Sequence, residues 1–236
     1  MQLVYIHHSG FALEAHKACL LFDYFEDSDN NYVTNMLHNF DGRIYVLCSH
    51  FHPDHFNRDV LKWTTIHPNI RYILSKDILR HRCARKEDGN YMVKGDVWND
   101  DRISVQAFGS TDSGISFGVK IDGQQVFHAG DLNNWHWRNE STEAESTYAE
   151  KQFLAEVHYI SKRMSACDLC MFPVDPRQGT EYIRGAQQFV AHIKVRNFVP
   201  MHFWGDFGAA NAAKTLIAPH VESYIELHHK GEVIAF

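Results

Sequence analysis

In RIYVLCSHFHPDHF, residues 43–56, an apolar run leads directly into a cluster of imidazole and carboxylate side chains. The run from Arg43 to Cys48 has the length and the β-branched content of a buried strand. The next seven residues supply three imidazoles and a carboxylate, from His50, His52, Asp54 and His55. The pattern therefore predicts a cluster of ligating side chains at the carboxyl end of a strand.

The residue types in this cluster indicate metal binding. Neutral imidazole and ionised carboxylate are the usual ligands of zinc and similar divalent metals. Residues at i and i+2 of extended backbone project to the same side, so His50 and His52 can converge on one ion while Asp54 and His55 reach a second. The alternative is a histidine-rich surface loop in a chain with 17 histidines. The spacing and the preceding strand favour the metal.

The motif in residues 50–55 resembles the signature of the metallo-β-lactamase-fold hydrolases, and two later segments resemble that family in order. Residues 127–131 end in Gly-Asp, which implies Asp131 as a carboxylate bridging two metals. Residues 198–203 look like the last ligand motif, which implies His202 on the second ion. The resemblance implies an α/β fold of the four-layer αββα sandwich type, with two mixed β-sheets flanked by helices.

The beginning of the chain carries a further resemblance. Val4 to Phe11, followed by Leu20-Leu21-Phe22-Asp23, is similar to the opening hairpin of the branch that contains L-ascorbate-6-phosphate lactonase-like proteins. His8 then corresponds to a family position beside the metal cleft, where an imidazole can donate to substrate or act as an acid. The alternative is a histidine bonded to the backbone of a turn.

One family landmark is missing. Where the family has Gly-His-Thr, this chain has Gly109-Ser110-Thr111-Asp112, so Ser110 stands at the place of the histidine. A serine hydroxyl is a poor zinc ligand beside imidazole. Either Asp112 or another side chain replaces the missing ligand, or the second site, with Asp54, His55, Asp131 and His202, holds the main ion. Asp112 also suits a turn stabilised by its own side chain.

Two further groups follow strands at the same expected edge. Asp175 and Arg177 come after the apolar run 168–174, where they can bind substrate, orient a ligand histidine, or form a salt-bridged loop. Trp135 and Trp137 follow the Gly-Asp motif closely, and either line the substrate cleft or pack in the core or under a lid.

Local patterns predict the other elements. Helices are expected at 32–40, 57–65, 142–164, 181–193 and 209–217. Strands are expected at 72–74, 103–108, 115–121, 125–128, 168–174 and 198–201. Asp122-Gly123 is typical of a hairpin turn, and residues 224–227 and 232–235 are predicted to form a closing hairpin around Lys230-Gly231.

Length and composition limit the possible domain organisation and the possible partners. The chain has 236 residues, of which 44% are hydrophobic, so we expect a single domain over 1–236 with a helical insertion at about 133–165. A net charge of −6 disfavours nucleic-acid partners. No apolar run is long enough for a membrane helix, and residues 1–5 lack the pattern of a signal peptide, so we expect a cytoplasmic protein. A homo-oligomer is left open.

These features together predict a metal-dependent hydrolase. A metal-activated water would attack a small-molecule ester, lactone or phosphoester, with Asp54 as ligand or general base. We expect one or two divalent ions, zinc foremost, with manganese or iron compatible with the same ligands. One alternative is a metal-dependent phosphodiesterase acting on a nucleotide or RNA. Another, of a different class, is a metal-binding or sensor protein that lost catalysis with the histidine replaced by Ser110.

Overall fold

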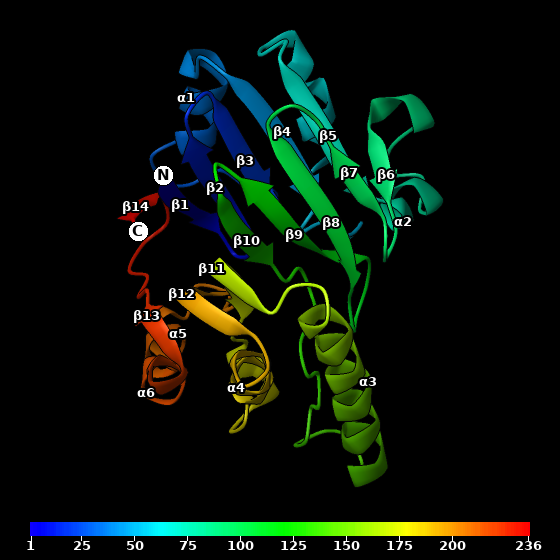
Figure 1. The fold of residues 1–236 in the computed structure, drawn as a ribbon, viewed down its shortest axis with the longest axis vertical. Helices are drawn as coiled ribbons and strands as arrows, with labels where there is room; N and C mark the ends of the chain where they lie inside the picture. Colours follow the sequence, from blue (N-terminus) through cyan, green and yellow to red (C-terminus); the bar gives the residue numbers. More distant parts are fainter. The chain divides into compact units, whose positions relative to one another are not determined.

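The computed structural model describes residues 1–236 and divides into two compact units. The first unit comprises Met1–Val93 together with His228–Phe236, and the second comprises Lys94–Leu227. Each unit contains one seven-stranded sheet with its own helices (Figure 1). The chain therefore returns to its first unit only at its C-terminal end.

The first unit is built on a mixed sheet in the order β14-β1-β2-β3-β4-β5-β6. Its strands are β1 (Gln2–His7), β2 (Gly10–Ala15), β3 (Ala18–Phe22), β4 (Arg43–Cys48), β5 (Ile70–Ser75), β6 (Asn90–Met92) and β14 (Glu232–Ala235). The strands β14, β1, β2 and β3 pair antiparallel, and β3 to β6 pair parallel. The parallel half brings the carboxyl ends of β3 and β4 to the same edge.

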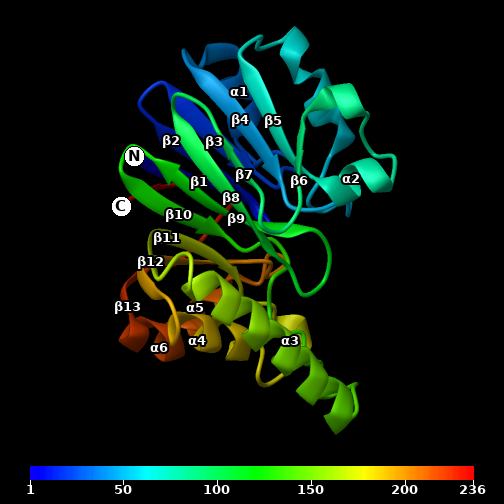
Figure 2. The ribbon, with the colours of Figure 1, turned by 45° about the vertical axis from the view of Figure 1, so that its right-hand side comes forward.

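The helices of the first unit lie on one face of its sheet (Figure 2). They are α1 (Tyr32–Asn39), α2 (Lys76–Arg80) and the 3-10 segments η1 (Arg58–Thr65) and η2 (Lys86–Asp88). Val33, Met36 and Leu37 of α1, with Val60 and Trp63 of η1, are buried against the apolar strands. At the beginning of α1, the Asp27 carboxylate accepts from the backbone N–H groups of Val33 and Thr34, both at 2.9 Å. Burial of an apolar face thus holds short helices that would not persist alone.

The second unit has a mixed sheet in the order β13-β12-β11-β10-β9-β8-β7. Its strands are β7 (Val97–Asn99), β8 (Ile103–Gly109), β9 (Ile115–Ile121), β10 (Gln124–His128), β11 (Ala166–Pro173), β12 (Lys194–Met201) and β13 (Val221–Tyr224). The strands β7 to β10 pair antiparallel and β10 to β13 pair parallel. Asp122 and Gly123, both with positive φ, make the tight turn between β9 and β10 that the sequence predicts.

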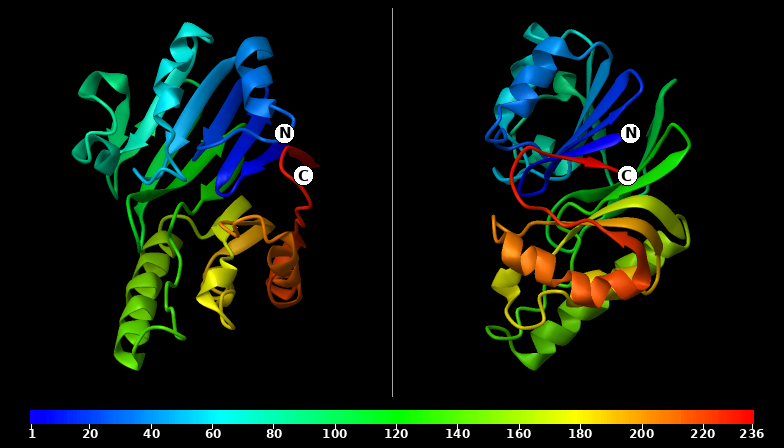
Figure 3. Two further views of the ribbon diagram at one scale, coloured as in Figure 1. Left: turned by 180° about the vertical axis from the view of Figure 1, so that it is seen from behind. Right: turned by 90° about the vertical axis from the view of Figure 1, so that its left-hand side faces the viewer.

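The helices of the second unit also lie on one face of their sheet (Figure 3). They are α3 (Glu143–Ser161), α4 (Arg184–Val190), α5 (Phe207–Ala212), α6 (Lys214–Ile217) and the 3-10 segments η3 (Pro176–Gln178) and η4 (Ala218–His220). Phe189 of α4 packs on Phe127 and Phe172, with ring centroids 5.0 and 4.7 Å apart. The longest helix, α3, lies within residues 133–165, where the sequence predicts a helical insertion, and its Phe153 is buried.

The predicted fold class, two mixed sheets flanked by helices as in the αββα sandwich, is confirmed. The predicted closing hairpin is wrong: residues 221–224 form β13, parallel to β12, whereas β14 pairs with β1 in the other sheet. The segment predicted as a helix at 57–65 is the 3-10 segment η1, and that at 209–217 is interrupted at Ala213. The single domain over 1–236 stays a prediction. No helix combines the length and apolarity needed to cross a membrane.

Candidate metal centre

The predicted histidine cluster lies where the sequence places it, directly after β4. His50 and His55 are fully buried and His52 is partly buried. The Nε2 atom of His50 is 3.0 Å from Nδ1 of His52, and the rings of His50 and His55 are 4.1 Å apart. The turn at 52–56 thus brings the three imidazoles together, with His50 next to both His52 and His55.

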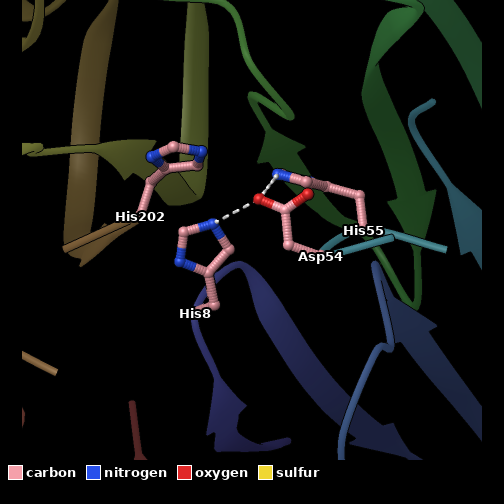
Figure 4. A group of neighbouring side chains, drawn as sticks. All are labelled: His8, Asp54, His55 and His202. Carbon is pink, nitrogen blue, oxygen red and sulfur yellow. Dashed lines mark ion pairs between the residues drawn. The ribbon is translucent and has the colours of Figure 1, made fainter. Parts of the chain in front are cut away.

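Asp54 joins this cluster to the hairpin between β1 and β2. Its Oδ2 atom is 3.4 Å from Nε2 of His8 and 3.8 Å from Nε2 of His55 (Figure 4). His8 is fully buried and occupies the turn with a left-handed φ of 57°. Burial alone would raise the pKa of Asp54, but the hydrogen bond from His8 and the charge of His55 lower it well below its ordinary value. Asp54 is therefore a carboxylate at neutral pH.

A buried carboxylate that the sequence interpretation missed orients the cluster. Asp23, directly after β3, is fully buried and accepts from Nδ1 of His55 at 2.8 Å. It also accepts from the backbone N–H of Ser49 at 2.7 Å and from the Ser49 hydroxyl at 2.6 Å. Because Nδ1 of His55 carries the proton that Asp23 accepts, Nε2 is left as the ligating atom. In the sequence, Asp23 stands only at the end of an apolar opening motif, and a lone aspartate after a strand gives no stronger signal.

The second unit presents an analogous pair. Asp131 follows β10 and His202 follows β12, and Oδ1 of Asp131 is 3.3 Å from Nε2 of His202. Nδ1 of His202 donates to Oδ2 of Asp175 at 3.0 Å. Arg177 binds both oxygens of Asp175 through its guanidinium. Of the three roles left open for Asp175 and Arg177, the structure places Asp175 against a predicted ligand histidine, with Arg177 as its ion-pair partner.

The charge balance at Asp175 is set by its partners. Burial alone would raise the pKa of this fully buried carboxyl group, but hydrogen bonds from His202 and Arg177 lower it to about 2. Asp175 therefore stays ionised and keeps its acceptor role toward Nδ1 of His202. Nε2 of His202 is then the atom that faces the Asp131 carboxylate.

The segment that lacks the family's histidine has a different internal arrangement. The Ser110 hydroxyl accepts from the backbone N–H of Asp112 at 3.3 Å, a local turn bond. A carboxylate oxygen of Asp112 lies within 4.8 Å of one of Asp131. Two carboxylates at this separation can contribute oxygen ligands to one divalent cation. This arrangement favours Asp112 over Ser110 as the replacement ligand.

The donors present suit a divalent transition metal. Each unit holds an imidazole whose Nδ1–H is bonded to a buried carboxylate, His55 with Asp23 and His202 with Asp175. This is the carboxylate–histidine pairing that supports metal ligation in proteins, and it makes Nε2 the nitrogen that would ligate a bound metal in both residues. Imidazole and carboxylate ligands are compatible with zinc, manganese and iron alike.

Comparisons with known proteins fit this donor set. The family model described as "Beta-lactamase superfamily domain" matches residues 2–146, more than half of the chain. The chain belongs to the β-lactamase superfamily. The superfamily is the one that the sequence resemblance predicts. No curated protein matches the chain in sequence.

Several solved structures resemble the chain. Igni18, a metallo hydrolase from the hyperthermophilic archaeon Ignicoccus hospitalis, is 19% identical over 100% of this chain and 97% of its own, with a TM-score of 0.72. The metallo-β-lactamase fold protein YhfI from Bacillus subtilis is 12% identical over 99% and 98%, with a TM-score of 0.65. The diiron β-hydroxylase CmlA from Streptomyces venezuelae is 12% identical over 100% of this chain and 54% of its own, with a TM-score of 0.65. At these identities the likeness concerns the fold.

Proposed function

We propose that this member of the superfamily uses a metal-activated water to hydrolyse a small-molecule ester, lactone or phosphoester. The observation that carries the proposal is the pairing of two buried imidazoles with buried carboxylates, His55 with Asp23 and His202 with Asp175. Each pairing fixes the orientation and the tautomer of the imidazole ring, which costs conformational entropy. Metal ligation requires a ring fixed in this way, whereas a histidine in a surface loop does not.

We propose His50, His52, Asp54 and His55 as metal ligands in the first unit, and Asp131 and His202 as metal ligands in the second. The near approach of Asp112 to Asp131 supports Asp112 as a further ligand in place of the histidine that Ser110 replaces. We propose one or two ions, with zinc foremost because imidazole dominates the set, and with manganese or iron compatible with its carboxylates.

The reaction divides between the ion and the side chains beside it. A bound divalent ion would lower the pKa of a coordinated water to about 7 and polarise the carbonyl or phosphoryl group under attack. Asp54 is ionised, so it can either ligate or accept the proton of the attacking water. Nε2 of His8, 3.4 Å from Oδ2 of Asp54, carries the proton of the hydrogen bond between them. His8 can give this proton to the leaving oxygen, and Asp54 can then pass the proton of the water to Nε2.

A substrate panel tests the proposal and separates it from its alternatives. Metal-loaded protein is assayed on a lactone, a carboxylic ester, a phosphomonoester and a cyclic phosphodiester. We expect turnover of at least one of the first three and its loss in Asp54→Ala, with Asp59→Ala, an exposed carboxylate in η1, as the matched control. Turnover of the phosphodiester alone would favour the nucleotide phosphodiesterase alternative. Stoichiometric metal with no turnover of any substrate would favour the sensor alternative and contradict the proposal.

The lactone arm also addresses the branch suggested by the N-terminal resemblance. The hairpin with His8 in its turn, similar to that of L-ascorbate-6-phosphate lactonase-like proteins, supports a lactone as the first substrate to try. A lactone that is opened faster than its acyclic ester would support that branch, and the reverse order would count against it.

A further inference from the structure

Two tryptophans of the second unit border His202, and a third stacks on one of them. The ring of Trp135 lies 5.4 Å from that of His202 at an angle of 61°, and the ring of Trp204 lies 6.3 Å from it at 82°. Trp137 stacks on Trp135, with centroids 6.1 Å apart and planes 13° from parallel. His202, a proposed ligand, is thus bordered by indole rings from two separate loops.

Core packing does not account for these side chains. Trp204 is 46% exposed, and Trp135 and Trp137 are only partly buried. The backbone of Trp137 and Trp204 also takes the left-handed conformation, with φ of 40° and 51°, which is unfavourable for a residue with a Cβ. Strain of this kind persists where the surroundings hold it and gathers at ligand sites. Trp137 and Trp204 are therefore held in an unfavourable backbone conformation although neither indole is fully buried.

Specific contacts fix the rings in place. The indole N–H of Trp135 donates to the backbone carbonyl of Asp131 at 2.8 Å. The guanidinium of Arg177 lies 5.0 Å from the ring centre of Trp204 and is held there by its three hydrogen bonds to Asp175. A preorganised aromatic surface loses little entropy when a ligand stacks on it.

We propose that Trp135, Trp137 and Trp204 form an aromatic subsite that binds a flat, uncharged ring of the substrate beside His202. This inference rests on the proposed function, because it assigns the group next to the cleaved bond. Indole faces favour offset stacking with other flat π-systems. The charge of Arg177 is balanced by Asp175, so the subsite favours an aryl or heteroaryl ring rather than an anionic group.

Kinetics on a matched pair of lactones test the subsite. Dihydrocoumarin and δ-valerolactone share a six-membered lactone ring, and only the first carries a fused aryl ring. We expect a lower KM for dihydrocoumarin, and we expect Trp204→Ala to raise that KM about tenfold while the KM for δ-valerolactone changes little. Trp204→Phe should restore the preference. Tyr148→Ala, which removes an exposed aromatic ring of α3, is the control.

Binding without turnover separates this inference from the proposed function. Metal-loaded protein is titrated calorimetrically with 2-naphthol. Cyclohexanol, which carries a hydroxyl group on a ring that is not flat, is the control. Saturable binding of 2-naphthol that Trp204→Ala weakens about tenfold would support the subsite even if no lactone is hydrolysed. Equal KM values for the two lactones, an equal effect of Trp204→Ala on both, or no binding of 2-naphthol would each overturn it.

Discussion

Replacing Asp23 by asparagine should weaken both metal binding and the folding of the first unit. The fully buried carboxylate accepts three hydrogen bonds, two from Ser49 and one from His55, at 2.6–2.8 Å. An asparagine keeps one acceptor oxygen and turns the other into a donor, so one or two of the three donors lose their acceptor. An unsatisfied buried donor costs about 1–3 kcal/mol, and we expect the free energy of unfolding to fall by about 2–4 kcal/mol.

The same change should act on the metal through His55. Without an anionic acceptor at Nδ1, the imidazole is free to change tautomer and orientation, which lowers metal affinity about 10- to 100-fold. Competition with a chromophoric chelator measures the affinity, and urea denaturation measures the stability of the same samples.

Asp27→Asn is the matched control for Asp23→Asn. The Asp27 carboxylate accepts from backbone N–H groups at the beginning of α1, and no imidazole is among its partners. We expect this control to lose stability and keep its metal affinity. If Asp23→Asn binds metal as tightly as the unsubstituted protein, the orienting role assigned to Asp23 is refuted.

Three further predictions concern other parts of the fold. Gly185→Ala should lower the free energy of unfolding, measured by urea denaturation, by about 1–3 kcal/mol, because a Cβ there would lie 1.8 Å from Oδ1 of the buried Asn133. An unchanged midpoint would contradict the packing described for α4. Glu145 and Thr142 together cap the N-terminus of α3. Hydrogen bonds from Thr142 lower the pKa of Glu145, so the stabilising effect of its carboxylate is present above its ordinary pKa of 4.5 and is lost as the pH falls through the lowered value. The stability difference between the unsubstituted protein and Glu145→Gln should therefore be larger at pH 7 than at pH 3, and a pH-independent difference would argue against the cap. Removing metal with EDTA should lower the thermal midpoint, since an ion at 100 times its Kd stabilises the folded state by about 2.7 kcal/mol, and re-addition should restore it.

Local sequence was sufficient for the parts of the site that follow buried strands. The cluster at 50–55, Asp131 and His202 each come directly after an apolar run, and β4, β10 and β12 end where those runs end. Strand alternation and the type of the following residue carry this information within a few positions. The turn at Asp122-Gly123 was predictable for the same reason, because its conformation depends on two adjacent residues.

Features that depend on distant partners were not predictable in this way. The bond from His55 to Asp23 joins residues 32 positions apart, and nothing in the sequence near Asp23 indicates it. The predicted closing hairpin failed for a related reason: β13 and β14 have the composition of adjacent strands, but each finds its partner in a different sheet. The exposure of Trp204 and the left-handed backbone that holds it likewise depend on tertiary structure.

The metal content of the purified protein tests whether His55 and His202 ligate a metal. Protein purified without added metal is analysed by inductively coupled plasma mass spectrometry, alongside His55→Ala, His202→Ala and the exposed-histidine control His192→Ala. We expect at least one equivalent of a divalent transition metal in the unsubstituted protein and the control, and a clear loss in both ligand variants. A metal-free unsubstituted protein, or full metal content in both ligand variants, would contradict it.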